Sequence, residues 1–86
     1  MNEAEIAEGV ETFVRRQFAV SDGDAGFGRQ TDLFDGGYVD SVGLAEMLGF
    51  IEERFGVTVP DEELLSDEFA SIEGIARTVS RLNSGG

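Results

Sequence analysis

Apolar residues recur at the spacing of an α-helix in three separate stretches of this sequence, residues 3–18, 41–55 and 71–82. At about 100° per residue, the apolar positions of each stretch fall on one face of a helix and the charged positions on the other. Each stretch therefore predicts a helix that buries one side. Three such helices predict an all-α protein with one core. The apolar face of the middle helix consists of Leu44, Met47, Leu48, Ile51 and Phe55.

The ends of these helices also carry sequence signals. Asn2 and Glu5 are spaced as a capping pair for the first helix, and Gly56 is placed to end the middle one. The residues before Pro60 should be extended, because a residue that precedes proline avoids helical backbone. Residues 61–70 predict one short, irregular helix. Its expected apolar anchors are Leu64, Leu65 and Phe69.

Residues 19–40 show no sustained period and are interrupted by glycines. A connection of this length is unusual in a small domain and is often functional. We expect Leu33 and Phe34 to attach it to the core, because leaving either side chain exposed would forgo about 1.5–3 kcal/mol.

Asp22 and Asp24 resemble the opening of a calcium-binding loop. The pattern then fails, because Gly26 stands where a third ligand belongs and Leu33 where the closing glutamate belongs. Calcium binding is therefore an unfavoured alternative, and we expect no metal site.

The charge balance limits the partners of the protein. The 86 residues include 18 acidic residues and six arginines, which gives a net charge of −12. The negative electrostatic field of this charge repels nucleic acids and anionic membranes and attracts enzymes with basic patches. It also favours a monomer. Because there is no cysteine, disulfides and thiolate metal sites are excluded. No apolar run reaches membrane-spanning length and the N-terminus is acidic, so we expect a cytoplasmic protein without membrane insertion.

Asp40 and Ser41 stand where the middle helix is expected to begin. A catalytic serine needs a group that removes its proton, and the sequence has no histidine, lysine or cysteine. We therefore interpret Ser41 as a residue that another enzyme modifies, with Gly43 keeping bulk away from its hydroxyl. A negatively charged modification suits the start of a helix, where free N–H groups and a partial positive charge lie. The alternative is that Asp40 or Ser41 only caps the helix.

Three further motifs accompany this pair, at residues 32–35, 55–61 and 67–72. Together with Asp-Ser-Val-Gly at 40–43, their order and spacing resemble the acyl carrier protein family over about residues 6–82. Members of that family carry an Asp-Ser pair at the start of their second helix, and the serine receives 4′-phosphopantetheine. The resemblance implies a four-helix bundle of acyl-carrier type, with a long loop between helices 1 and 2 and a short third helix.

The resemblance also implies a carrier rather than an enzyme. A phosphopantetheinyl transferase would transfer the arm from coenzyme A to Ser41, and Asp40 would help present the serine to the transferase and its Mg²⁺. The thiol of the arm would hold acyl or aminoacyl groups as thioesters. A loading enzyme would supply them, and a downstream synthase, transferase or modifying enzyme would use them.

Residues 40–43 and 55–60 look closer to standalone carriers of amino acids, D-alanine or unusual polyketide extender units than to the housekeeping fatty-acid carrier. We therefore expect a role in specialised metabolism of the polyketide or nonribosomal peptide type. Residues 1–82 should form the single carrier domain, and residues 83–86 a flexible C-terminal tail.

Partner enzymes of the carrier family dock against the outward face of the second helix. Here that face carries Val42, directly after the serine, followed by Glu46 and Glu53. The resemblance implies that these side chains form a recognition surface. The alternative is that the glutamates are an ordinary solvated helix face. A second hypothesis for the whole chain is an unmodified acidic helical domain that binds a basic protein partner through charge.

Overall fold

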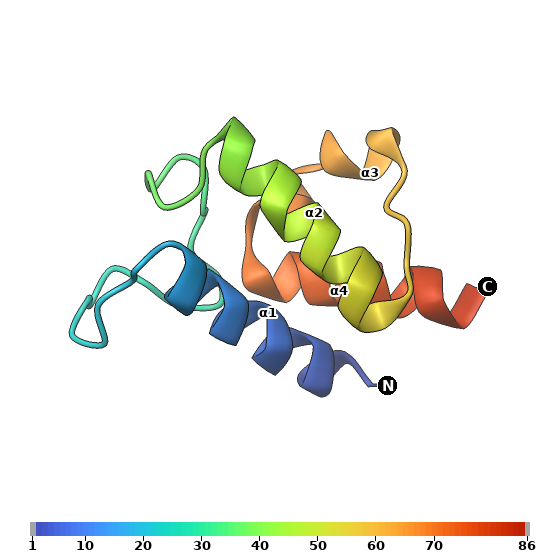
Figure 1. Cartoon of the computed structure of the whole chain (residues 1–86), viewed down its shortest axis with the longest axis horizontal. Coiled ribbons are helices and arrows are strands. Elements are labelled where there is room, and N and C mark those ends of the chain that lie inside the picture. The colour runs from blue at the N-terminus through green and yellow to red at the C-terminus, as the bar shows by residue number, and fades with distance from the viewer. Residues whose placement is uncertain (1, 86) are drawn as a thin grey trace.

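A computed structural model describes residues 2–85 (Figure 1). Within that range there is no β-strand, so the all-α prediction is confirmed. α1 packs along α4, and α2 lies across the pair and contacts both. The start of α1 and the end of α4 lie at the opposite end of the molecule from the long connection before α2. The elements are α1 (Glu3–Gln17), α2 (Ser41–Phe55), α3 (Asp61–Leu64), the 3₁₀ turn η1 (Asp67–Ala70) and α4 (Ile72–Gly85).

The core forms where the apolar faces of α1, α2 and α4 meet. On α2, Met47, Ile51 and Phe55 are buried, while Leu44 and Leu48 are half-buried at the edge. The predicted apolar face is therefore confirmed. None of the helices in residues 2–85 is long and apolar enough to cross a membrane. Side chains with no exposed surface at all include Ile6, Val10, Val14, Leu33, Met47, Ile51, Ile72, Ile75 and Val79.

The predicted caps are present at the helix ends. The Asn2 side chain accepts a hydrogen bond from the Glu5 N–H at 2.8 Å, and the Glu5 carboxylate accepts one from the Asn2 N–H. Gly56 ends α2 in the left-handed region, at a φ of 67°. α4 continues to Gly85, past its expected end at Leu82. The flexibility of residues 83–86 stays a prediction, and Gly86 lies outside the described residues.

The third helical segment differs from its prediction. It is broken between α3 and η1, because the Ser66 hydroxyl accepts the Glu68 N–H at 3.2 Å and starts a new turn. Leu65 lies at this break with 87% of its surface exposed, so its predicted role as an anchor is wrong. Leu64 is half-buried, and Phe69 reaches the core.

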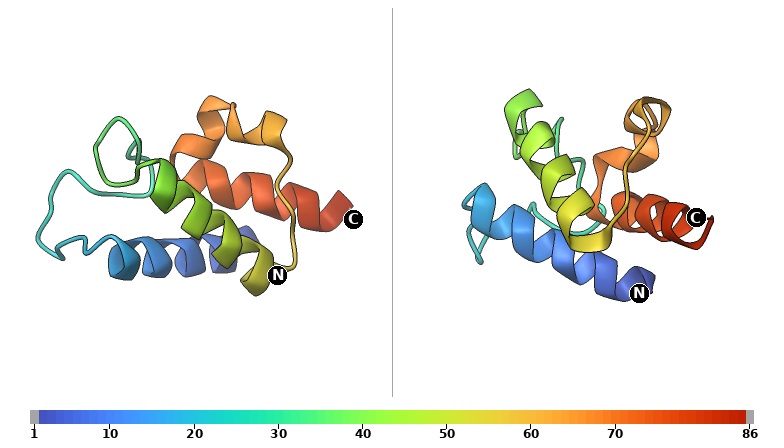
Figure 2. Two further views of the ribbon diagram at one scale, coloured as in Figure 1. Left: turned by 45° about the horizontal axis from the view of Figure 1, so that its top comes forward. Right: turned by 45° about the vertical axis from the view of Figure 1, so that its right-hand side comes forward.

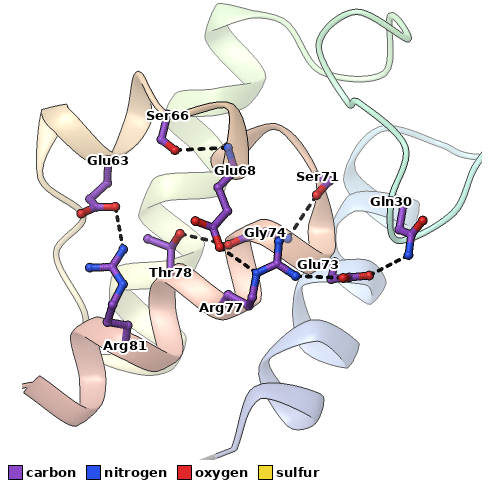
Figure 3. Close-up of polar contacts among 10 residues, drawn as sticks. All are labelled: Gln30, Glu63, Ser66, Glu68, Ser71, Glu73, Gly74, Arg77, Thr78 and Arg81. Atoms are coloured by element: carbon purple, nitrogen blue, oxygen red, sulfur yellow. Dashed lines mark hydrogen bonds and ion pairs between the residues drawn. The ribbon is translucent and has the colours of Figure 1, made fainter.

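α3 and η1 lie on the far side of α4 from α1 (Figure 2). Arginines of α4 contact both of them, as Figure 3 shows. The Arg77 guanidinium lies 2.7 Å from the carboxylate of Glu68 and 2.8 Å from that of Glu73. The Arg81 guanidinium lies 2.8 Å from the carboxylate of Glu63.

The connection from residue 18 to residue 40 is irregular but firmly attached. Leu33 is fully buried as predicted, and its N–H donates to the Ala70 carbonyl at 2.8 Å, whereas Phe34 is only half-buried. The carbonyl of Arg29 accepts the Glu73 N–H at the start of α4, at 2.9 Å. The loop therefore joins α4 through backbone hydrogen bonds as well as through apolar burial.

The carboxylate of Asp24 takes part in the hydrogen bonding of this loop. It accepts hydrogen bonds from the Gly26 N–H at 2.9 Å and from the Tyr38 hydroxyl at 2.8 Å. Across residues 2–85, no cluster of acidic side chains is arranged to hold a metal ion. The calcium alternative therefore gains no support from the structure.

Candidate functional site

Ser41 is the first residue of α2, and its side chain is exposed. The cap of the helix is Asp40, whose carboxylate accepts the Gly43 N–H at 2.8 Å. Of the two capping alternatives, the structure thus gives that role to Asp40. The Ser41 hydroxyl makes no hydrogen bond to any group within residues 2–85 and is left facing solvent.

Three other serines use their hydroxyls for local structure. The hydroxyls of Ser21, Ser66 and Ser71 accept backbone N–H groups two or three residues further on, at 3.1–3.2 Å. Each therefore holds a turn or caps a helix, which is the ordinary structural role of a serine. Ser41 differs from all three because it stands at a helix start without that role.

The chain reaches Ser41 through a tight return beside Leu33. The Leu33 carbonyl accepts the N–H groups of both Tyr38 and Val39, at 2.9 and 3.0 Å. Gly37 has a φ of 80°, which side chains other than glycine rarely tolerate. Val39 is buried, and the chain then emerges at Asp40. This anchored turn fixes where the serine appears.

Gly43 has a different role from the one expected of it. It is buried, and a Cβ there would lie 2.7 Å from the ring of Phe18 and 3.2 Å from the Val39 side chain. Gly43 therefore lets these side chains pack against the first turn of α2, so its close packing explains the glycine better than protection of the hydroxyl does.

Ser41 borders an open depression of about 510 Å³, which we call the loop depression. Its apolar walls come from the end of α1, the long loop and the second turn of α2. A larger hollow, of about 620 Å³, lies between α1 and α2 around Phe13 and Phe50, but Ser41 does not line it. The loop depression is lined by Phe18, Phe34, Gly37, Tyr38, Val39, Asp40, Ser41 and Leu44.

Local contacts hold these walls in place. The hydrogen bond from the Tyr38 hydroxyl to the Asp24 carboxylate raises the pKa of the tyrosine. Its ring also meets the edge of the Phe27 ring, at a centroid distance of 5.2 Å. The aromatic lining was not predicted from the sequence: Phe34 and Tyr38 lie close to the Asp-Ser pair, but Phe18 lies far from it in the chain.

The predicted docking residues lie along the outer face of α2. Val42 is 70% exposed beside the serine, and Glu46 and Glu53 are exposed further on. Glu53 lies twelve positions after Ser41, which places their Cα atoms about 18 Å apart along the helix. The carboxylate of Glu46 also accepts a hydrogen bond from the Gln17 side chain. Asp40, Ser41 and Val42 thus lie together at the start of α2, and the two glutamates lie further along the helix.

Phe50 closes an edge of the core between α2 and α1. It stacks on Phe13 of α1, with centroids 4.4 Å apart and ring planes 16° apart. Its ring also meets the edge of Phe55 at 5.8 Å. Phe50 therefore packs against α1, because α2 lies across that helix.

Comparison with known proteins agrees with this architecture. Residues 9–79 match the family described as a phosphopantetheine attachment site, which covers most of the chain. The chain therefore belongs to the phosphopantetheine-attachment family of carrier domains, as the resemblance to acyl carrier proteins had indicated. This family consists of carriers, so the prediction that the chain is not an enzyme is confirmed.

Named relatives are similar over part of their length. The chain is 39% identical to a D-alanyl carrier protein of Bacillus velezensis over 51 residues, which are 59% of this chain and 65% of the relative. It is 36% identical to a D-alanyl carrier protein of Streptococcus sanguinis over 53 residues, 62% of this chain and 67% of the relative. The matched region thus spans about two thirds of these relatives.

Membership of the family implies a covalent 4′-phosphopantetheine on a serine. The residues around Ser41 fit such a group. Its hydroxyl is exposed and free, and the first N–H groups of α2 have no partner within the helix. Asp40 takes the N–H of Gly43, which leaves those of Ser41 and Val42 to face a phosphodiester.

Proposed function

We propose that Ser41 is the attachment site of 4′-phosphopantetheine and that the protein carries acyl or aminoacyl groups as thioesters on the arm. The observation that supports this most is the free, exposed hydroxyl of Ser41 beside the capping carboxylate of Asp40. An anionic phosphodiester is favoured there by the partial positive charge at the start of a 15-residue helix.

The transfer to Ser41 requires an enzyme, because the sequence has no histidine, lysine or cysteine to activate the serine. In that step the serine oxygen forms a bond to the phosphorus that bears the pantetheine arm of coenzyme A. The phosphoanhydride bond breaks, adenosine 3′,5′-bisphosphate leaves, and a base on the phosphopantetheinyl transferase accepts the serine proton. Asp40 uses one carboxylate oxygen for the cap, and the other is available to the transferase or its Mg²⁺.

The identity of the group carried on the arm is a more specific part of the proposal. The D-alanyl carrier proteins among the relatives favour an aminoacyl group, so D-alanine is the first substrate to test. An intermediate of polyketide or nonribosomal peptide synthesis, which we expected from the sequence, is the second. A loading enzyme would supply either group, and downstream enzymes would use it.

Recognition by these enzymes would involve the outer face of α2. Val42 presents an exposed apolar side chain next to the attachment point, and Glu46 and Glu53 add negative charge along the same helix. With a net charge of −12, the protein would be attracted to basic patches on its partners. We also propose that it acts in the cytoplasm as a monomer.

The test is intact-protein mass spectrometry after incubation with coenzyme A, Mg²⁺ and a broad-specificity phosphopantetheinyl transferase. We expect the parent protein to gain one phosphopantetheine and Ser41→Ala to gain none. Ser66→Ala is the matched control, because it removes an exposed capping serine elsewhere and should still be modified. Circular dichroism would confirm that all three are folded.

If the folded parent gains no mass with several transferases, the second hypothesis takes precedence. The protein would then be an unmodified acidic domain that binds a basic partner. In that case Ser41→Ala would leave partner binding unchanged.

A further inference from the structure

The loop depression is the apolar surface nearest to the attachment point, and Ser41 forms part of its rim. Leu44 lies three residues after Ser41, so the two side chains share one side of α2. Phe18, Phe34 and Tyr38 face the same hollow from α1 and the loop. All four apolar side chains are half-buried, so each keeps part of its surface open to solvent.

We propose that this depression is a seat for the phosphopantetheine arm itself. The inference rests on attachment of the arm at Ser41. In this arrangement the arm turns away from the exposed face of α2 and lies against the loop, where the apolar walls reduce the access of water to it.

The depression is preformed, which lowers the cost of seating the arm. The Tyr38 hydroxyl is held by Asp24 at 2.8 Å, and its ring packs against Phe27. The Phe18 ring packs over Gly43 and meets the edge of Phe13 at 6.1 Å. Because these side chains are already fixed, only the arm has to lose conformational freedom.

The arm is the occupant that the site favours, because one end of it is covalently held at the rim. A short tether gives an effective concentration on the order of millimolar, so weak contacts are enough to seat it. The pantetheine portion carries no charge and combines methyl groups with amides. That chemistry suits a surface of aromatic and apolar side chains.

The composition of the chain supplies two unique probes for this inference. There is no cysteine, so the thiol of the arm is the only thiol of the modified protein. There is no tryptophan and one tyrosine, so ultraviolet-excited fluorescence reports on Tyr38 alone. One probe therefore lies on the arm and the other on the wall of the proposed seat.

The experiment compares the apo-protein with the modified protein, after mass spectrometry has confirmed that the arm is present. With at least half of the arms seated, acrylamide quenching of Tyr38 fluorescence should fall to about half its apo value, and the thiol should react with an aromatic disulfide at about half the rate of free pantetheine or less. Leu44→Gln should restore fast thiol reaction. Leu48→Gln is the matched control, because Leu48 is a half-buried leucine of the same helix outside the depression.

The controls separate the seat from other effects. The negative charge of the protein also slows a thiol by disfavouring its thiolate, but both leucine variants keep that charge. If Leu44→Gln is not modified by the transferase, Phe34→Ala replaces it. Unchanged Tyr38 quenching together with equal thiol rates in both leucine variants would overturn the inference and leave the arm in solvent. Failure of the parent to gain the arm would instead overturn the proposed function.

Discussion

Residues 18–40 lead into α2 without regular structure, and residues 60–70 lead away from it through α3 and η1. The irregular connection is the better anchored of the two. It buries Phe27, Leu33 and Val39, whereas the helical segment buries only Phe69 fully, and α3 has no buried residue. Regular hydrogen bonding within a segment therefore says little about how firmly that segment is attached to the core.

The kinds of interaction differ as well. The loop before α2 donates and accepts backbone hydrogen bonds with η1 and the start of α4. α3 is joined to α4 by the exposed ion pair between Glu63 and Arg81. Apolar burial and backbone hydrogen bonds persist in salt, while exposed ion pairs weaken. Ser41 lies where the firmly attached connection meets α2, so burial of Val39 and the hydrogen bonds to Leu33 fix its position.

The largest expected effect contrasts Leu33 with Leu65. Leu33→Ala removes a fully buried side chain and should lower the free energy of unfolding by about 2–5 kcal/mol. Leu65→Ala removes a side chain that is 87% exposed and should change it by less than about 0.5 kcal/mol. Urea unfolding followed by circular dichroism measures both. Equal losses in the two variants would contradict the contrast between the connections.

The next effect tests the close packing of η1 on α4, which attaches residues 60–70 to the core. A Cβ on Gly74 would lie 1.6 Å from the carbonyl oxygen of Glu68, so Gly74→Ala should push η1 away from α4 and cost about 1–3 kcal/mol. Gly49→Ala is the control, because nothing lies within 4 Å of a Cβ there and alanine should stabilise α2 by up to about 1 kcal/mol. If both variants were stabilised, η1 would not be packed as described.

A smaller effect concerns the ionic contact of the loop. Glu11 lies 2.8 Å from Arg29 and 2.9 Å from Arg15, and hydrogen bonds from Arg29 and then Arg15 lower the pKa of its carboxyl below 4.5. Because the folded pKa is lowered, the stabilisation is complete above the unfolded pKa and is lost as the pH falls through the folded pKa. Glu11→Gln should therefore cost about 1 kcal/mol at pH 7, and the difference from the parent should shrink below about pH 4.5.

The control for this prediction is Glu8→Gln, which removes the same charge from an exposed position of α1. Thermal unfolding between pH 3 and pH 7 would compare the three proteins. A cost of Glu11→Gln that stays constant over this range would show that the charge of Glu11 does not hold the loop.

The smallest expected effect tests whether the ion pair between Glu63 and Arg81 holds α3 against α4. Arg81→Gln removes the ion pair with Glu63, so the amides of residues 61–66 should exchange hydrogen faster while those of residues 31–39 stay unchanged. Added salt should have the same effect on the parent protein. Arg16→Gln, an exposed arginine without an ion pair in residues 2–85, is the control. Slow exchange in α3 after both treatments would mean that Leu64 holds the segment instead.

Much of the fold could be predicted because helices are local. The periodicity that places Met47 and Ile51 on one face lies within a few turns, and the caps at Asn2, Gly56 and Ser71 depend on residues within three or four positions. Helical periodicity did not reveal the break at Leu65, because the hydroxyl of Ser66 starts a new turn there.

The candidate site divides in the same way. Asp40 and Ser41 were identified from the sequence, because a cap and the first residue of a helix are set by their neighbours. The walls of the loop depression were missed, since Phe18 and Tyr38 come from separate segments that only the folded chain brings together. The stacking of Phe50 on Phe13 was missed for the same reason.

The sequence by itself determined the helices, the negative charge and the place of Ser41 at a helix start, because each follows from residues close together in the chain. The tertiary structure alone decided that the irregular loop is firmly attached and that an aromatic hollow borders the serine. Those features depend on contacts between distant residues, such as Leu33 with Ala70 and Arg29 with Glu73. Such contacts form only when the helices pack, so no local pattern encodes them.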